Sequence, residues 1–365
     1  MAIEQRTDSL RTDSMEAFYD ELASKHMDAL WRGRVAGTGT NGEPVVPYAP
    51  YRWAWTDIRP FVDRAAQLVR PGPDAERRVI QLIHPELTAL RAASHTLTAN
   101  VQLVLPGEIA PSHRHTTGAI RFIMEGTAAI TIVNGEPVSM SPGDLVLTPG
   151  WCWHGHINQS EGPVMWMDCL DRPITVALRQ ALQEPYSDEL QPATTPLGDS
   201  TARYGAGHLR PMGTHATSPI SPLFSYPWAD TERSLHELAR FSSDPFDDVA
   251  FDYTNPLTGG HVMPTIGCRI QMLRPGVHTQ AHRHSSVSVY HVFRGCGSSI
   301  VDGVQIDWEQ GDFLTIPPFA WHEHLNPSSD EAVLFSTTDA PVLEALCLYR
   351  EDAYTKTGGH QEVKA

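Results

Sequence analysis

The chain has 365 residues, and its 27 basic and 43 acidic residues give a formal net charge of −16. This length allows two domains, and the acidic balance argues against a surface for nucleic acid or for an anionic membrane. No run of about 18 apolar residues exists, so no transmembrane helix is expected. The N-terminus is polar, unlike a secretory signal, and the five cysteines are scattered without a CxxC pair. We therefore expect a cytoplasmic protein with reduced thiols.

Two helices are predicted in an N-terminal arm, residues 1–75. The first runs from about residue 13 to 34, where apolar side chains recur at roughly helical spacing. The second begins at residue 56 or 57, runs to about 68, and is ended by the PGP sequence at 71–73. Residues 1–12 are expected to lack fixed structure.

Short strand-like segments dominate the remaining chain. The first group is followed by turns that contain Pro-Gly or Asn-Gly and is predicted at residues 98–105, 119–125, 127–133, 144–148 and 164–168. This regular spacing is typical of a sandwich or a small barrel. We expect a first β domain at 76–175, a linker rich in Pro, Ser, Thr and Gly at 176–260, a second β domain at 261–340, and a closing helix with a tail at 341–365.

Three histidines in the first β domain have a spacing typical of metal ligands. His113 and His115 are two residues apart, so in a strand both imidazoles point to one face. His154, from a later strand, can complete a facial set of nitrogen donors. Such a set with open positions opposite suits a non-haem Fe(II) that binds substrate and O2.

An internal repeat duplicates this histidine pattern. PGEIAPSHRHTTGAIRFIMEG (106–126) is mirrored by PGVHTQAHRHSSVSVYHVFRG (275–295), 169 residues later. PGDLVLTPGWCWHGHIN is mirrored by EQGDFLTIPPFAWHEHLN (309–326), 168 residues later. Each half has Gly, five residues and HxH, then Gly-Asp, Pro, and a His followed four residues later by Asn.

This double pattern resembles the two motifs of the cupin superfamily, a small double-sheet β-barrel that holds a metal. The chain therefore resembles a bicupin, a mainly β protein with two double-stranded β-helix barrels, preceded here by N-terminal helices. Many metal-binding cupins carry a Glu ligand four or five residues after HxH. Those positions are Ala119 and Ile120 in the first half, and Ser288 and Val289 in the second. We therefore expect a three-histidine site.

The second half offers a possible second metal site at His282, His284 and His322. Its counterpart to Arg121 is Tyr290, so the cation that could bind an anion is missing there. We therefore expect the main reaction centre in the first half.

Longer stretches resemble the gentisate 1,2-dioxygenases and their salicylate and 1-hydroxy-2-naphthoate relatives. They include ERRVIQLIHPEL, LVLPGEIAPSHRHTTGAIRFIMEG, PGWCWHGHINQSEGPVMWMDCLDRP, NPLTGGHVMPT and APVLEALCLYRED. The resemblance implies opening of a 2-hydroxybenzoate such as gentisate with Fe(II) and O2, in a homo-oligomer, a tetramer in this family. The substrate would be cleaved between its carboxyl-bearing and hydroxyl-bearing carbons to maleylpyruvate or an analogue.

Polar residues near the triad fit this chemistry. Arg121 could pair with the substrate carboxylate or with negative charge on oxygen, and His156 could exchange a proton with the substrate hydroxyl. Asp168 or Asp171 could orient a histidine through its other ring nitrogen. By resemblance, Arg77 and Gln102 also line the pocket.

One departure concerns the strand that leads to the site. The family commonly has an aromatic residue and then a glycine two residues later, as in LYAGLQ, whereas LTANVQ has Thr98 and Asn100 there. These positions lie near the substrate ring in the family. The replacement removes an aromatic wall and adds an amide, so salicylate, 5-nitro- or 5-chlorosalicylate and 1-hydroxy-2-naphthoate stay open as substrates.

Simpler interpretations stay open beside these. Three imidazoles also bind Mn, Ni or Zn. Arg121 could be a surface cation in an ion pair, His156 a core histidine, and Asp168 a turn or salt-bridge residue. The whole chain could be a non-enzymatic cupin that binds or senses aromatic acids, or an isomerase or decarboxylase of the same fold.

Overall fold

The protein is described by a computed structural model covering residues 14–32, 43–70 and 77–364, which divides into two units, Met1–Pro47 and Tyr48–Ala365. In the first unit a helix covers residues 14–24, and a 3-10 helix, η1 (Leu30–Arg32), follows. The single helix predicted for about residues 13 to 34 is interrupted, because the chain turns at His26, where φ is 58°.

Several expectations cannot be compared with the described residues. The predicted ends of the first helix, the segment 1–12 and the PGP stop at 71–73 all lie outside them. The second helix, α2 (Trp55–Leu68), is present as predicted.

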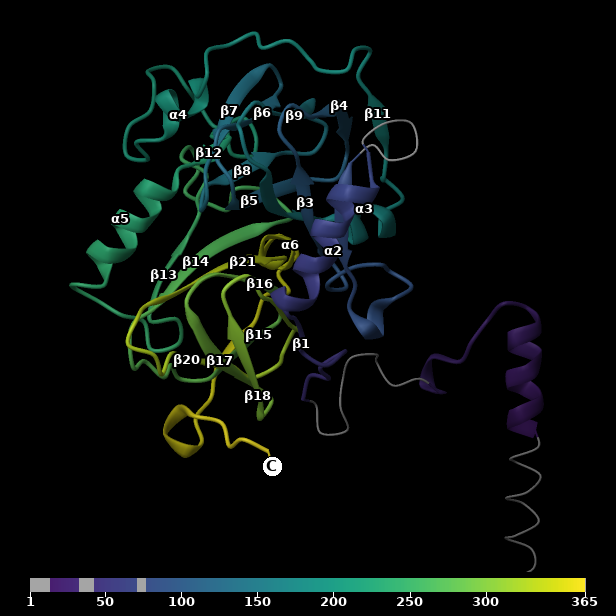
Figure 1. The fold of residues 1–365 in the computed structure, drawn as a ribbon. Coiled ribbons are helices and arrows are strands. Elements are labelled where there is room, and N and C mark those ends of the chain that lie inside the picture. The colour runs from purple at the N-terminus through teal and green to yellow at the C-terminus, as the bar shows by residue number, and fades with distance from the viewer. Residues whose placement is uncertain (1–13, 33–42, 71–76, 365) are drawn as a thin grey trace, which may run out of the picture. The chain divides into compact units, whose positions relative to one another are not determined.

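Two double-sheet barrels make up the second unit (Figure 1), which confirms the mainly β, two-barrel prediction. The strands of the first barrel are β2 (Arg78–Leu82), β3 (Thr98–Val104), β4 (Ile109–His115), β5 (Ala119–Glu125), β6 (Ala129–Val133), β7 (Glu136–Met140), β8 (Leu145–Thr148), β9 (His154–Asn158), β10 (Val164–Leu170), β11 (Gln183–Pro185) and β12 (Ser225–Tyr226). They form a six-stranded sheet, β12-β8-β5-β10-β3-β2, and a five-stranded sheet, β11-β4-β9-β6-β7.

The second barrel repeats this arrangement. Its strands are β1 (Tyr51–Trp53), β13 (Val249–Asp252), β14 (Gly267–Leu273), β15 (His282–His284), β16 (Ser288–Arg294), β17 (Cys296–Val301), β18 (Val304–Glu309), β19 (Phe313–Ile316), β20 (His322–Leu325), β21 (Ala332–Thr338) and β22 (Glu351–Ala353). The six-stranded sheet is ordered β1-β19-β16-β21-β14-β13 and the five-stranded sheet β18-β17-β20-β15-β22.

Short helices connect these strands. They are η2 (Pro85–Leu87), α3 (Arg172–Ala177), α4 (Asp199–Tyr204), α5 (Trp228–Leu238), α6 (Ala340–Ala345) and η3 (Thr357–Gly359). The stretch predicted as a linker thus contains helices and strands, and the closing helix α6 is shorter than predicted. The domain boundaries themselves stay a prediction.

The main core lies between the two six-stranded sheets. On β5, Ile120 and Phe122 point away from the first barrel's interior, and the Phe122 ring stacks on Phe335 of β21 with ring centroids 4.1 Å apart. Their neighbour Ile123 joins Trp166 in a separate cluster inside the first barrel. Alternation along the strand therefore separates the inter-barrel core from the barrel interior.

The two halves exchange their leading strand and helix. Strand β1, just before α2, pairs with β19 of the second barrel, whereas β12, just before α5, pairs with β8 of the first barrel. Each barrel's sheet is therefore completed by a strand from the other half's connecting segment. This arrangement was not predicted, because short strands with few apolar residues carry little periodicity.

The Gly-Asp motif explains how each exchanged helix is held. Asp144 accepts a hydrogen bond from the backbone N–H of Trp228 at 2.8 Å, and Asp312 accepts one from Trp55 at 2.7 Å. The preceding glycines have φ of 88° at Gly143 and 96° at Gly311, and an added Cβ would lie 2.6 Å and 2.4 Å from these tryptophan rings. Both motif residues therefore serve packing and helix capping.

Candidate metal and substrate site

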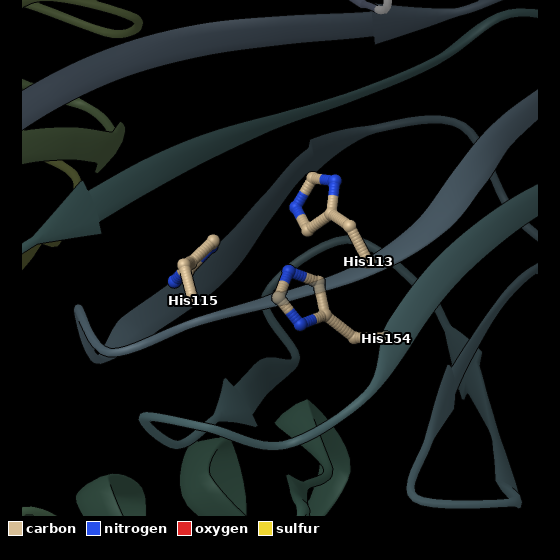
Figure 2. Close-up of side chains that lie close together, drawn as sticks. All are labelled: His113, His115 and His154. Carbon is tan, nitrogen blue, oxygen red and sulfur yellow. The ribbon is translucent and has the colours of Figure 1, made fainter. Parts of the chain in front are cut away.

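Three histidines meet inside the first barrel. His113 and His115 lie on β4, and His154 on β9 is directly opposite His113 in the antiparallel register. The ring centroids are 4.7 to 5.3 Å apart, and one nitrogen of each ring lies within 4.8 Å of the others. Figure 2 shows the three rings gathered around one space.

Backbone carbonyls fix the orientation of two of these rings. Nδ1 of His115 lies 2.7 Å from the Thr117 carbonyl, and Nδ1 of His154 lies 2.9 Å from the Cys152 carbonyl. Since a carbonyl only accepts, each Nδ1 donates its proton and each Nε2 keeps a lone pair. The buried Nε2 of His154 has no hydrogen-bond partner among the described residues.

Burial and nearby cations keep these rings neutral. Burial, followed by the charge of His113, lowers the pKa of His115 to about 4. Burial and then the charge of Arg121 lower the pKa of His154 well below its usual value. Neutral imidazoles with free lone pairs are the form that binds a divalent metal, so the ring chemistry fits one.

Arg77 reaches into the cluster from the segment before β2. Its guanidinium lies 3.2 Å from Nδ1 of His113 and 3.2 Å from Nε2 of His156, and it donates to the Pro111 carbonyl at 3.0 Å. A guanidinium has no acceptor atom, so it donates to both rings. A neutral His113 whose Nδ1 accepts this bond carries its proton on Nε2. Metal binding through Nε2 of His113 therefore requires this contact with Arg77 to change.

A polar row crosses the six-stranded sheet of the same barrel. Arg121 on β5 is opposite Asp168 on β10, which is opposite Asn100 on β3. Residues directly opposite one another in antiparallel strands share a face. Nε of Arg121 is 3.2 Å from Asp168 without hydrogen-bond alignment, and its Nη1 donates to Oγ1 of Thr148 at 2.6 Å.

The charges in this row are buried. Arg121 is 2% exposed and Asp168 is 5% exposed. Burial lowers the pKa of Arg121 and raises the pKa of Asp168, and each charge opposes the other's shift. A surface position for Arg121 is thereby excluded.

The remaining predicted residues lie in the same interior. His156 is fully buried, and its Nδ1 lies 2.8 Å from Oγ1 of Thr131. Burial, followed by the charge of Arg121, lowers the pKa of His156 well below its usual value. Gln102 and Thr98 are buried on β3, and Nε2 of Gln102 has no hydrogen-bond partner among the described residues.

Neither aspartate orients a histidine in this structure. Asp168 lies against Arg121, as described above. Asp171 accepts hydrogen bonds from the Gly118 N–H at 2.9 Å and from Oγ1 of Thr265 at 2.5 Å. The histidines use backbone carbonyls and a threonine instead. The carbonyls of Thr117 and Cys152 were missed because a backbone partner leaves no mark in the sequence of side chains. The hydroxyl of Thr131 was missed because its contact with His156 depends on the register between β6 and β9.

A second triad lies in the second barrel. His282 and His284 lie on β15, and His322 on β20 is opposite His282. Nδ1 of His284 lies 2.8 Å from the Ser286 carbonyl and Nδ1 of His322 lies 3.0 Å from the Ala320 carbonyl. Nδ1 of His282 instead meets Glu351 at 3.2 Å.

The sheet opposite this second triad has a different row. Tyr290 is opposite Ser336, which is opposite Arg269. Arg269 is paired with Asp247 at 3.3 Å and with Asp252 at 3.2 Å. A cavity of about 20 Å³ beside His284 is lined by Arg269, Ser336 and Tyr349 among others, which is room for about one water molecule. Arg269 was missed, although it aligns with Asn100 in the repeat.

Comparisons with known proteins agree with the two barrels. The family model described as "Cupin domain" matches residues 100–170 and 269–338. A 5-aminosalicylate 1,2-dioxygenase from Comamonas sp is 38% identical, with 97% of this chain and 94% of that protein covered. "Gentisate 1,2 dioxygenase 1" from Aquipseudomonas alcaligenes is 36% identical, with 93% and 96% covered.

Solved structures give the same result. The crystal structure of a salicylate 1,2-dioxygenase from Pseudaminobacter salicylatoxidans superposes with a TM-score of 0.84 at 32% identity, covering 93% of this chain and 97% of that one. A structure of that enzyme described as an adduct with gentisate has a TM-score of 0.85, also at 32% identity, and covers 93% of each chain. Among the described helices, none is long and apolar enough to cross a membrane.

Proposed function

Because the chain belongs to the gentisate 1,2-dioxygenase family of ring-cleaving bicupin dioxygenases, we propose that it opens gentisate between the carboxyl-bearing and hydroxyl-bearing carbons to give maleylpyruvate. The observation that carries this proposal is Arg121, a buried cation whose charge acts on His115 and His154 of the triad. A chelating aromatic acid needs a metal and a cation side by side. The first barrel supplies three histidines as ligands for the metal and the side chain of Arg121 as the cation.

The metal in this proposal is Fe(II), held by His113, His115 and His154. Three neutral imidazoles leave the metal's positive charge uncompensated, which favours a bidentate anionic ligand such as a 2-hydroxybenzoate. A bound Fe(II) supplies the one-electron chemistry that O2 needs to react with an aromatic ring. The buried Nε2 of His154, which has no hydrogen-bond partner in the part of the chain that the structure describes, supports a metal at this place.

Two arginines bind the negative charge of the substrate. Arg121 is held in place by Asp168 and Thr148, so its guanidinium is preorganised for a carboxylate or for negative charge on oxygen. The substrate carboxylate also competes for Arg77, which otherwise donates to His113 and His156. Drawing Arg77 away frees Nδ1 of His113 to carry a proton and leaves Nε2 available for the metal.

His156 accepts the proton of the 2-hydroxyl in this proposal. Its Nε2 accepts a hydrogen bond from Arg77, and its Nδ1–H is donated to Oγ1 of Thr131. When Arg77 turns to the substrate, Nε2 becomes the acceptor for the hydroxyl proton. Thr131 then stabilises the resulting imidazolium. The nearby cations that lower the pKa of His156 also favour return of that proton.

The 5-substituent is recognised by β3. Thr98, Asn100 and Gln102 point to one face of this strand. Thr98 and Asn100 there replace the aromatic residue and the glycine common in the family. Nε2 of Gln102 is buried without a partner among the described residues, so it can donate to a 5-hydroxyl or 5-amino group. The relative named for 5-aminosalicylate supports that compound as the second candidate substrate.

The second triad is proposed as a possible second metal site without ring-cleaving activity. Arg269 beside it is neutralised by two aspartates, and the adjoining cavity is too small for a benzoate. A metal at His282, His284 and His322 would therefore have a structural role.

We also propose a cytoplasmic homo-oligomer, a tetramer by family resemblance. Leu30 is 92% exposed and Trp31 is 68% exposed in the first unit, which suits burial against another subunit. Light scattering of Leu30→Asp should show smaller assemblies than the parent. Met212→Asp, at a residue that is fully exposed outside this segment, should leave the mass unchanged, and an unchanged mass for both variants would contradict the interface.

The proposal is tested by oxygen uptake after anaerobic loading with Fe(II). Gentisate and 5-aminosalicylate should each consume one O2 per ring opened, followed together by product absorbance, with salicylate and 1-hydroxy-2-naphthoate slower. Protein loaded with Zn(II) or Mn(II) is the matched control and should be inactive. Absence of uptake with every 2-hydroxy acid would overturn the proposal, and equal rates with Zn(II) would overturn the choice of Fe(II).

A further inference from the structure

We propose that the outer wall of the second barrel carries a third metal site, formed by His278, Glu323 and His360 and suited to Zn2+ or a similar divalent transition ion. One nitrogen or oxygen from each side chain lies within 4.8 Å of the others. The three residues come from the loop before β15, from β20 and from the C-terminal tail, so the ion would join three separate segments. This site is distinct from both barrel-interior triads and goes beyond the proposed ring cleavage.

Glu323 is the centre of this outer site. It lies between His322 and His324 on β20, so its side chain points to the opposite face of the strand, away from the second triad. The residue is fully buried. Its Oε1 accepts the Gln361 backbone N–H at 2.9 Å, which leaves Oε2 directed at the two imidazoles.

The distances fit a shared cation. Oε2 of Glu323 is 2.9 Å from Nδ1 of His360 and 3.3 Å from Nε2 of His278. Ligands about 2.0–2.2 Å from a tetrahedral zinc ion are roughly 3.3–3.6 Å from one another. Only small shifts of exposed side chains are therefore needed. The side chains of His278 and His360 are 39% and 37% exposed, so the ion can enter from solvent, and water can take the fourth position.

The repeat shows that this cluster is not a property of the barrel as such. With the offset of 168, the first-barrel counterpart of Glu323 is Gly155, and with the offset of 169 that of His278 is Ile109. An added Cβ at Gly155 would lie 2.4 Å from Oγ of Ser112, so the first barrel has no room for a carboxylate there. The outer ligands are therefore an addition to the second half.

The ion would hold the C-terminal tail against the barrel. Gln361 donates to the Ile300 carbonyl at 2.8 Å and accepts from the Gly303 N–H at 3.0 Å. The same terminal segment begins at β22, where Glu351 contacts His282 of the second triad. An ion at the outer site would fix the other end of the segment between β22 and Gln361, which includes the exposed residue Lys356.

The test is zinc binding by the full-length chain after removal of metals. Equilibrium dialysis against ZnCl2 should give one ion fewer per chain for His360→Gln and for His278→Gln than for the parent. The control His215→Gln changes an exposed histidine outside the cluster and should match the parent. Equal zinc content in all four proteins would overturn the proposal.

Trypsin cleavage after Lys356 gives a second readout. Zinc should slow this cleavage at least about 10-fold in the parent, because cleavage requires the tail to open, and it should have little effect in His360→Gln. Equal protection by zinc in both proteins would place the effect at the interior triads and would contradict the outer site. Urea unfolding without zinc checks that the variants fold. We expect them to fold, because the imidazoles of His278 and His360 are partly exposed and their replacement leaves no hole in the core.

Discussion

The two barrels present the same ligand pattern and different polar rows opposite it. In the first barrel the row is Arg121, Asp168 and Asn100, whereas in the second it is Tyr290, Ser336 and Arg269. The second row still contains an arginine, but two strands further along the sheet, on β14, where Asp247 and Asp252 pair with it.

We infer from this difference that a set of three histidines alone does not make a reaction centre. Both triads consist of histidines whose Nδ1 atoms are engaged and whose rings are largely buried. In the first barrel the charge of Arg121 adds to burial in lowering the pKa of His154 and His156. In the second barrel the charge of Arg269 also lowers the pKa of His284, but the charge of Asp247 opposes it. We therefore propose that the row supplies the ability to bind an anionic substrate. Of the four predictions below, the replacements of Arg121 and Asn100 test the row, and the other two test the packing and the buried histidines that the barrels share.

Replacement of Arg121 should have the largest effect. Arg121→Lys keeps the positive charge beside Asp168 but loses the planar guanidinium, so kcat/KM for gentisate should fall by about 10²-fold or more. The matched variant Tyr290→Phe, at the equivalent position of the second barrel, should leave kcat/KM close to the parent value. Steady-state oxygen uptake measures both. Similar losses in the two variants would remove the distinction between the barrels.

Replacement of the two motif glycines should destabilise the protein. Gly143→Ala and Gly311→Ala place a Cβ against Trp228 and Trp55 at positive φ, which should lower the free energy of unfolding by about 2–4 kcal/mol each. Gly107→Ala is the control, since its φ is also positive but nothing lies within 4 Å, so only about 1 kcal/mol of backbone strain is expected. Urea unfolding measures all three. A loss at Gly143 no larger than at Gly107 would contradict the close packing of the exchanged helix.

The metal-free protein should lose stability in mild acid. Burial lowers the pKa of His115, His284 and His324 to about 4 in the folded chain, against about 6.5 when unfolded. The unfolded chain therefore binds more protons below pH 6.5, and the free energy of unfolding falls as the pH falls from there toward 4, by about 1 kcal/mol per histidine at pH 5.5. Urea unfolding at pH 7.5 and 5.5 checks this. Equal stability at both pH values would mean that these rings take up protons as readily in the folded chain as in the unfolded chain, and would contradict the lowered pKa values.

Asn100→Ala should have the smallest effect and should alter substrate choice. Loss of one hydrogen bond costs about 1 kcal/mol, so the ratio of kcat/KM for 5-aminosalicylate and gentisate should change about fivefold. The measurement is the ratio within one enzyme preparation, which cancels differences in iron content. An unchanged ratio would exclude Asn100 from recognition of the 5-substituent.

Local patterns were enough to predict that the three histidines of the first half meet in one barrel, and to predict the strands that carry apolar residues. The HxH spacing identified His113 and His115, and aligning the repeat singled out Arg121. The exchange of β1 and β12 could not be predicted, because it depends on contacts between residues hundreds of positions apart, such as Asp312 with Trp55. Arg269 was overlooked because it lies two strands from the position equivalent to Arg121, and its place in the row is seen only when the sheet register is known.

The central claim is that ring cleavage takes place in the first barrel alone, and oxygen uptake by two paired variants tests it most directly. His282→Gln/His284→Gln, loaded with Fe(II), should open gentisate at close to the parental rate with one O2 consumed per ring. His113→Gln/His115→Gln, treated identically, should consume none. Turnover that survives in the second variant and disappears in the first would contradict the account and move the reaction to the second barrel.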